Sequence, residues 1–128
     1  MAMNHVPILK LGDALVVTIQ AALTDAEMDQ ARREIAESVA KHRVRGLLVD
    51  VSALDVLDSF ASRTLVTMAK VVSLRGARTV IVGIQPDVAF AMVQLGLTME
   101  GLETSLDLEG GLDMLGLRVE SKPPGTSA

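Results

Sequence analysis

Short aliphatic runs that alternate with amphipathic stretches constrain the fold of this chain more than any other feature. Runs at 8–11 and 15–19 flank a Gly12-Asp13 turn, which predicts an antiparallel hairpin. Further runs at 47–52, 79–84 and 104–106 are each followed by a helical pattern. This alternation implies parallel strands joined by right-handed crossovers. We therefore predict an α/β fold with a mixed, mostly parallel sheet of four to five strands packed with about four helices.

Local signals mark the expected helices. Thr24 and Glu27 have the spacing of a capping box, and Gly46 is expected to close the connection after that helix. Pro86 suits the first turn of the third helix, and the last one is expected to start at Gly111. Apolar residues at helical spacing are expected to be buried, namely Met28, Ala31, Ile35, Val39, Ala61, Leu65, Met68, Val72, Val88, Met92 and Leu95.

Length and composition exclude several classes of protein. With 128 residues, the chain suits one domain, which we place at 8–120 between a leader (1–7) and a flexible tail (121–128). A net charge of −4 argues against nucleic-acid binding, and the lack of cysteine excludes disulfides and thiol catalysis. Because no 18 apolar residues run together, we expect a cytoplasmic protein without a membrane segment. Met99 is expected on an exposed partner-binding loop.

Ser59 is the sharpest chemical feature of the sequence. It falls at or next to the first residue of the helix that follows the 47–52 strand, with Asp55 and Asp58 beside it. A serine at that place can cap the helix with its hydroxyl. It can also accept a phosphoryl group, because free N–H groups and the helix dipole favour an anion there. The two interpretations predict different roles for the same hydroxyl.

Other chemistries find less support. A nucleophilic serine needs a nearby base, and His42 is expected on the order of 20 Å away, at about 3.3 Å per residue of strand. No nucleotide-binding or other cofactor motif occurs. Asp50, Asp55 and Asp58 could bind Mg²⁺, but an acidic turn at a helix N-terminus explains them as well. A receiver-like phosphoaspartate relay through Asp50 and a small-molecule-binding α/β module stay open.

The segment Leu54-Asp55-Val56-Leu57-Asp58-Ser59-Phe60, with Arg63 after it, resembles the phosphoserine loop of STAS domains, the anti-sigma factor antagonists. The likeness extends from about Ile8 to Glu120. Phe60 and Ala61 stand where sporulation-type antagonists usually have Ser-Gly, which favours the branch of the single-domain stressosome scaffold.

The resemblance implies a non-enzymatic protein that sequesters a serine kinase of the histidine-kinase-like ATPase fold. It implies that phosphorylation of Ser59 releases the kinase and that a PP2C-type phosphatase reverses the mark. Asp55, Asp58, Phe60 and Arg63 would form the partner-binding loop, and Ser62, Thr64 and Asp50 are the alternative acceptors. The resemblance also implies a large assembly with a sensor-bearing STAS paralogue, in a bacterial stress response.

Overall fold

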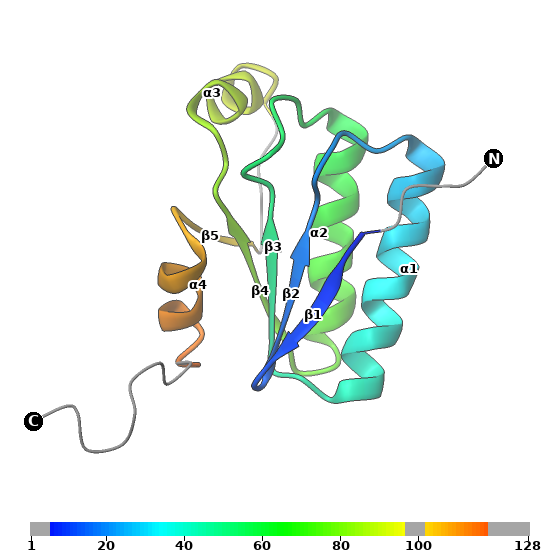
Figure 1. Cartoon of the computed structure of the whole chain (residues 1–128). Helices are drawn as coiled ribbons and strands as arrows, with labels where there is room; N and C mark the ends of the chain where they lie inside the picture. The colour runs from blue at the N-terminus through cyan, green and yellow to red at the C-terminus, as the bar shows by residue number, and fades with distance from the viewer. Residues whose placement is uncertain (1–5, 97–101, 118–128) are drawn as a thin grey trace, which may run out of the picture.

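A computed structural model of the chain describes residues 6–96 and 102–117. Its sheet has five strands in the order β1-β2-β3-β4-β5 (Figure 1). Only β1 and β2 pair antiparallel, and the other neighbours are parallel. The predicted mixed, mostly parallel sheet is therefore confirmed. The strands are β1 (Ile8–Leu11), β2 (Ala14–Thr18), β3 (Gly46–Asp50), β4 (Arg78–Val82) and β5 (Glu103–Ser105).

The described residues form four helices. They are α1 (Asp25–His42), α2 (Ser59–Ser73), α3 (Pro86–Gln94) and α4 (Leu108–Met114). Buried side chains of α1 and α2 form the larger core with Leu15, Leu47 and Val49. The alternate residues of the strands, such as Val16 and Leu48, face α4 and form a smaller core with Leu112. Figure 1 shows α1 and α2 side by side on one face of the sheet and α4 on the other.

The first helix begins as predicted. Thr24 accepts a hydrogen bond from the N–H of Glu27, and the Glu27 carboxylate accepts one from the N–H of Thr24. Its four predicted stripe residues are all buried. Pro86 occupies the first turn of α3, also as predicted.

The connection after α1 closes at Gly46, as predicted: Arg43, with φ of 51°, caps the helix, and Gly46 is the first residue of β3, where an added Cβ would approach Leu115 Cδ1 to 2.6 Å. Two other local predictions are wrong. Leu95 is 68% exposed because α3 ends at Gln94. The last helix begins at Leu108, since Asp107 caps it through the N–H of Gly110.

The proposed leader and tail fall mostly outside the described residues, as does the expected loop at Met99. Val6 and Pro7 are described: Val6 is buried in the larger core, and the Pro7 carbonyl accepts a hydrogen bond from the N–H of Thr18. The domain limits remain a prediction. None of the described helices is both long and apolar enough to cross a membrane.

Candidate functional site

The loop between β3 and α2 lies at the carboxyl edge of the parallel strands, where functional groups of open α/β sheets gather. It leaves the middle strand of the sheet at Val51, whose N–H donates to the Val82 carbonyl. Leu54 and Leu57 are buried and anchor the loop to the larger core. These anchors fix Ser59 as the first residue of α2, as the sequence predicted to within one residue.

Asp58, and not Ser59, caps α2. Its carboxylate accepts a hydrogen bond of 2.8 Å from the N–H of Ala61, and its backbone is extended (φ −76°, ψ 176°). The interpretation of Ser59 as the cap is therefore wrong. Ser59 is half-buried, and within the described residues its hydroxyl makes no hydrogen bond. The Ser59 hydroxyl is therefore available to accept a phosphoryl group.

The alternative acceptors are less available than Ser59. Ser62 is only 2% exposed, and among the described residues its hydroxyl has no hydrogen-bond partner. The Thr64 hydroxyl donates to the Phe60 carbonyl over 2.8 Å. The Asp50 carboxylate accepts from the N–H of Ser52 over 2.9 Å. Of the three hydroxyl groups, only that of Ser59 is both partly exposed and without a hydrogen bond within the described residues.

The other predicted site residues lie on the surface around Ser59. Asp55 and Arg63 are exposed and form no ion pair within the described part of the chain. Phe60 is 37% exposed, and Val56, which the sequence did not single out, is 60% exposed. Arg63 follows Ser59 by four residues, which places both on one face of α2. The loop therefore offers two apolar side chains and two acidic ones next to the serine hydroxyl.

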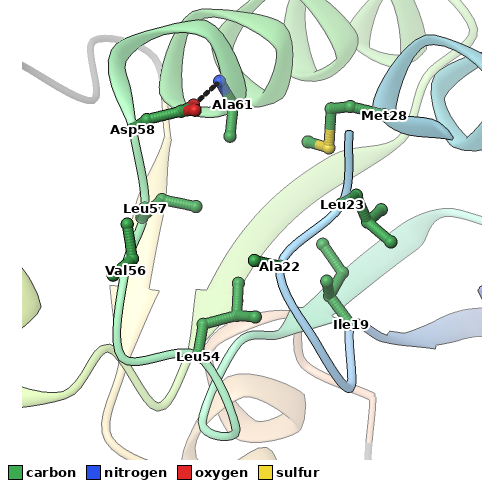
Figure 2. Close-up of a pocket in the computed structure, with 9 residues that line it drawn as sticks. All are labelled: Ile19, Ala22, Leu23, Met28, Leu54, Val56, Leu57, Asp58 and Ala61. Atoms are coloured by element: carbon green, nitrogen blue, oxygen red, sulfur yellow. Dashed lines mark hydrogen bonds between the residues drawn. The ribbon is translucent and has the colours of Figure 1, made fainter. Parts of the chain in front are cut away.

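A small pocket opens beside this loop, between the N-terminal ends of α1 and α2 (Figure 2). Its volume is about 40 Å³, far below the ~300–1,000 Å³ of drug-sized ligand sites. The pocket therefore does not support a small-molecule-binding module. Sequence reasoning missed it, because its walls come from two distant segments. The lining residues are Ile19, Ala22, Leu23, Met28, Leu54, Val56, Leu57, Asp58 and Ala61.

The neighbouring loop supports the site from the other side. Gln85 Nε2 donates a hydrogen bond of 2.8 Å to the Ser52 carbonyl. Gly83 adopts φ of 79°, and a Cβ there would lie 2.8 Å from the Ser52 Cβ. This close approach of the two loops fixes the start of the β3–α2 connection. Nothing local in the sequence marked Gln85 for this role.

The geometry also argues against three other roles: a receiver-like relay through Asp50, a metal site, and His42 as a base for Ser59. A receiver-type doubly wound sheet has the strand order 2-1-3-4-5, whereas this sheet runs 1-2-3-4-5 with an antiparallel edge. Within the described residues, no three acidic or histidine side chains gather as a metal site. His42 is in the last turn of α1, at the opposite edge of the sheet from Ser59.

The STAS-domain family model matches residues 5–109. The chain therefore belongs to the STAS-domain family. The RsbS of Moorella thermoacetica, solved with a serine replaced by glutamate, is 36% identical and has a TM-score of 0.76; the match covers 88% of this chain and 96% of that one. A chain from a structure titled "Molecular architecture of the stressosome, a signal integration and transduction hub" is 35% identical, with a TM-score of 0.70 and coverage of 86% and 96%.

Among curated proteins, the "RsbT co-antagonist protein RsbRA" of Bacillus subtilis is 25% identical over 99 residues. The match covers 75% of this chain but only 36% of that relative, so the chain spans about a third of its length. The unphosphorylated anti-sigma factor antagonist SpoIIAA, 15% identical with a TM-score of 0.70, shares the fold. Within its family, this chain is thus a STAS domain of the anti-sigma factor antagonist and stressosome type.

Proposed function

We propose that this domain is a phosphorylation-gated, non-enzymatic scaffold, with Ser59 as the regulatory acceptor. One observation carries the proposal: Asp58 caps α2 in place of Ser59 and leaves a half-buried hydroxyl unengaged at the first position of the helix. Phosphorylation requires the Ser59 oxygen to attack a phosphoryl donor, and within the described residues no hydrogen bond engages that oxygen.

A phosphate on Ser59 would act through local charge. It adds about −1.5 to −2 charges at neutral pH. The helix N-terminus attracts it by roughly 0.3–1 kcal/mol. Asp55 and Asp58 repel it by a similar amount at surface dielectric. Because these effects nearly cancel, the fold stays the same and the new charge acts on whatever protein packs against this edge.

The captured protein, in this proposal, is a serine kinase of the histidine-kinase-like ATPase fold, similar to RsbT. The name of the curated relative RsbRA, an RsbT co-antagonist, supports this assignment. The unmodified loop binds the kinase through Val56 and Phe60, both partly exposed. Phosphorylation of Ser59 puts a charge into that packed contact and releases the kinase, and a PP2C-type phosphatase restores the binding form.

Assembly is the second half of the proposed function. The match to a chain of a stressosome structure supports association with STAS paralogues, among them RsbR-like proteins that carry a sensor domain. Sedimentation of this protein with such a paralogue is expected to give a particle far larger than a dimer. Finding only monomers and dimers in that mixture would contradict the scaffold role.

Intact-mass analysis of the protein purified from stressed cells tests the acceptor. We expect an addition of about 80 Da, one HPO₃ group, in the wild type. It should be lost in Ser59→Ala and kept in the matched variants Ser62→Ala and Thr64→Ala. Because phosphoserine survives hot acid and an acyl phosphate does not, acid treatment separates Ser59 from Asp50. A mark that persists on Ser59→Ala, or that never appears, would overturn the proposal.

A pull-down with the RsbT-like kinase tests its capture. Ser59→Ala should retain the kinase in the presence of ATP, whereas Ser59→Asp should retain less of it. Equal retention by both variants would show that charge at this position does not control binding.

A further inference from the structure

Helix α3 is apolar on both of its faces. On the inner face, Val88 and Met92 are buried in the larger core. On the outer face, Phe90 is 64% exposed and Val93 is 76% exposed. Only two of the nine residues of the helix are polar. Because a surface helix normally carries polar residues on the face opposite the core, this pattern is typical of a helix whose outer face is covered by a partner.

Both aromatic residues of the chain are exposed. The sequence contains two phenylalanines, Phe60 and Phe90, and neither tryptophan nor tyrosine. Phe60 is 37% exposed and Phe90 is 64% exposed, although phenylalanine is among the residues most often fully buried. The two cores are instead built from aliphatic residues and methionine. Aromatic side chains are enriched where proteins bind one another and often supply much of the binding energy, so the exposure of both indicates a protein-binding surface.

The two phenylalanines lie at the same edge of the sheet. Phe60 is in the first turn of α2, which follows β3, and Phe90 is in α3, which follows the neighbouring parallel strand β4 (Figure 1). The loops that lead into the two helices are joined, because Gln85 donates its hydrogen bond to the Ser52 carbonyl. The buried side chains of α3 also belong to the same core as the anchors of the β3–α2 loop. A protein that binds over Phe60 therefore has α3 beside it.

The β3–α2 loop alone offers little surface to a partner. A stable contact between proteins involves about 20–30 residues on each side. The loop spans only residues 51–58, and Val51, Leu54 and Leu57 among them are buried in the larger core. The kinase that, in our proposal, phosphorylates Ser59 therefore needs further surface at this edge. The outer face of α3 supplies an apolar one.

We propose that the outer face of α3, with Phe90 and Val93 as its main contacts, is a second docking surface for the kinase that binds at Ser59. This inference rests on the proposed function, because it names further residues that hold the same partner. Asp87 is the only charged residue of α3, so the contact is apolar and should depend little on salt. Phe90 thus contributes affinity, whereas Ser59 contributes the response to phosphorylation.

Binding of the RsbT-like kinase to full-length variants tests this surface. Phe90→Ser should lower the association constant by roughly tenfold or more, as expected for an aromatic anchor, and Val93→Ser should lower it by a smaller factor. Leu74→Ser is the matched control, because Leu74 follows the end of α2 at the opposite edge of the sheet and is 88% exposed. It should change the constant by less than about twofold. All three positions are exposed, and circular dichroism verifies that the variants fold.

The outcomes separate this inference from the proposed function. Tighter kinase binding by the wild type than by Ser59→Asp, together with weakened binding by Phe90→Ser, supports both. If the wild type and Ser59→Asp differ but Phe90→Ser binds as tightly as the wild type, the α3 surface is overturned and the proposed function stands. A wild type that does not bind the kinase would overturn both.

Thiol labelling locates the contact directly. The chain has no cysteine, so Val93→Cys and Leu74→Cys each introduce a single thiol, and the mass of the domain reports its reaction with a maleimide. Saturating kinase should slow the labelling at position 93 by roughly fivefold or more, because the core of an interface excludes solvent, and should leave position 74 unchanged. An unchanged rate at position 93 would overturn the inference. Slower labelling with a sensor-bearing STAS paralogue but not with the kinase would also overturn it, because α3 would then belong to the assembly contact.

Discussion

Asp58 and Ser59 are neighbours with separate tasks at one helix end. The Asp58 carboxylate binds the N–H of Ala61, while the Ser59 hydroxyl contributes nothing to the cap. We therefore predict that Asp58→Ala lowers the free energy of unfolding by about 1 kcal/mol. Asp58→Asn should retain most of that stability, and Ser59→Ala and the exposed control Asp55→Ala should change it by less than ~0.5 kcal/mol. Urea titration measures all four, and a larger loss for Ser59→Ala than for Asp58→Ala would contradict this division.

Replacement of Ser62 is predicted to stabilise the protein, in contrast to replacement of Asp58. Its hydroxyl is buried and has no hydrogen-bond partner in the part of the chain that the structure describes, which costs about 1–3 kcal/mol of desolvation. Alanine at this position removes the unpaired oxygen and suits a helix better. Ser62→Ala should therefore raise the free energy of unfolding by about 1 kcal/mol in urea titration. Ser73→Ala is the matched control, because the Ser73 hydroxyl is bonded to the Lys70 carbonyl and exposed, so its replacement should bring no gain.

At the scale of the elements, α4 depends on two glycines for its approach to the sheet. A Cβ at Gly111 would lie 2.5 Å from Leu48 Cδ2 and 3.2 Å from Val82 Cγ2, in the smaller core. Gly111→Ala should thus destabilise the fold by about 1–3 kcal/mol, despite the better helix propensity of alanine. Gly110→Ala should cost less, because its nearest contact is the Ser105 hydroxyl, which can rotate away. Thermal unfolding compares the two, and equal stability of Gly111→Ala and wild type would mean that α4 can move off the sheet.

The elements also show what sequence patterns can and cannot predict. The capping box at Thr24, the hairpin at Gly12-Asp13 and the helix start at Pro86 depend on residues within a few positions of each other, and all three were predicted correctly. Gly46 was placed correctly, but the packing reason for a glycine there was not predicted, because it is the approach of Leu115, 69 positions away in the chain. The pocket and the Gln85–Ser52 bond were missed for the same reason. At the site, the place of Ser59 was predicted, but which of two adjacent residues caps the helix was decided only by geometry.

For the molecule as a whole, hydrogen bonds join successive strand ends at the edge that carries Ser59. The Ile19 N–H donates to the Asp50 carbonyl, Gln85 donates to the Ser52 carbonyl, and the Gly83 N–H donates to the Ser105 carbonyl. These bonds tie the β3–α2 loop to both neighbouring loops. Because these hydrogen bonds hold the edge in place, a charge added at Ser59 is expected to change partner binding and not the fold.

The hydrogen bonds at this edge lead to a prediction for the protein that carries phosphoserine at position 59. Attraction by the helix N-terminus and repulsion by Asp55 and Asp58 leave a net effect within about 1 kcal/mol, so the melting temperature should shift by less than ~6 °C. Amide chemical shifts should change in residues 50–63 and in the facing pocket wall at 19–28, and stay constant in β1 and α4. Shifts that spread to α4, which packs on the other face of the sheet, would mean that phosphorylation rearranges the core. Regulation would then act through a conformational change, and partner release could no longer be ascribed to charge at the edge alone.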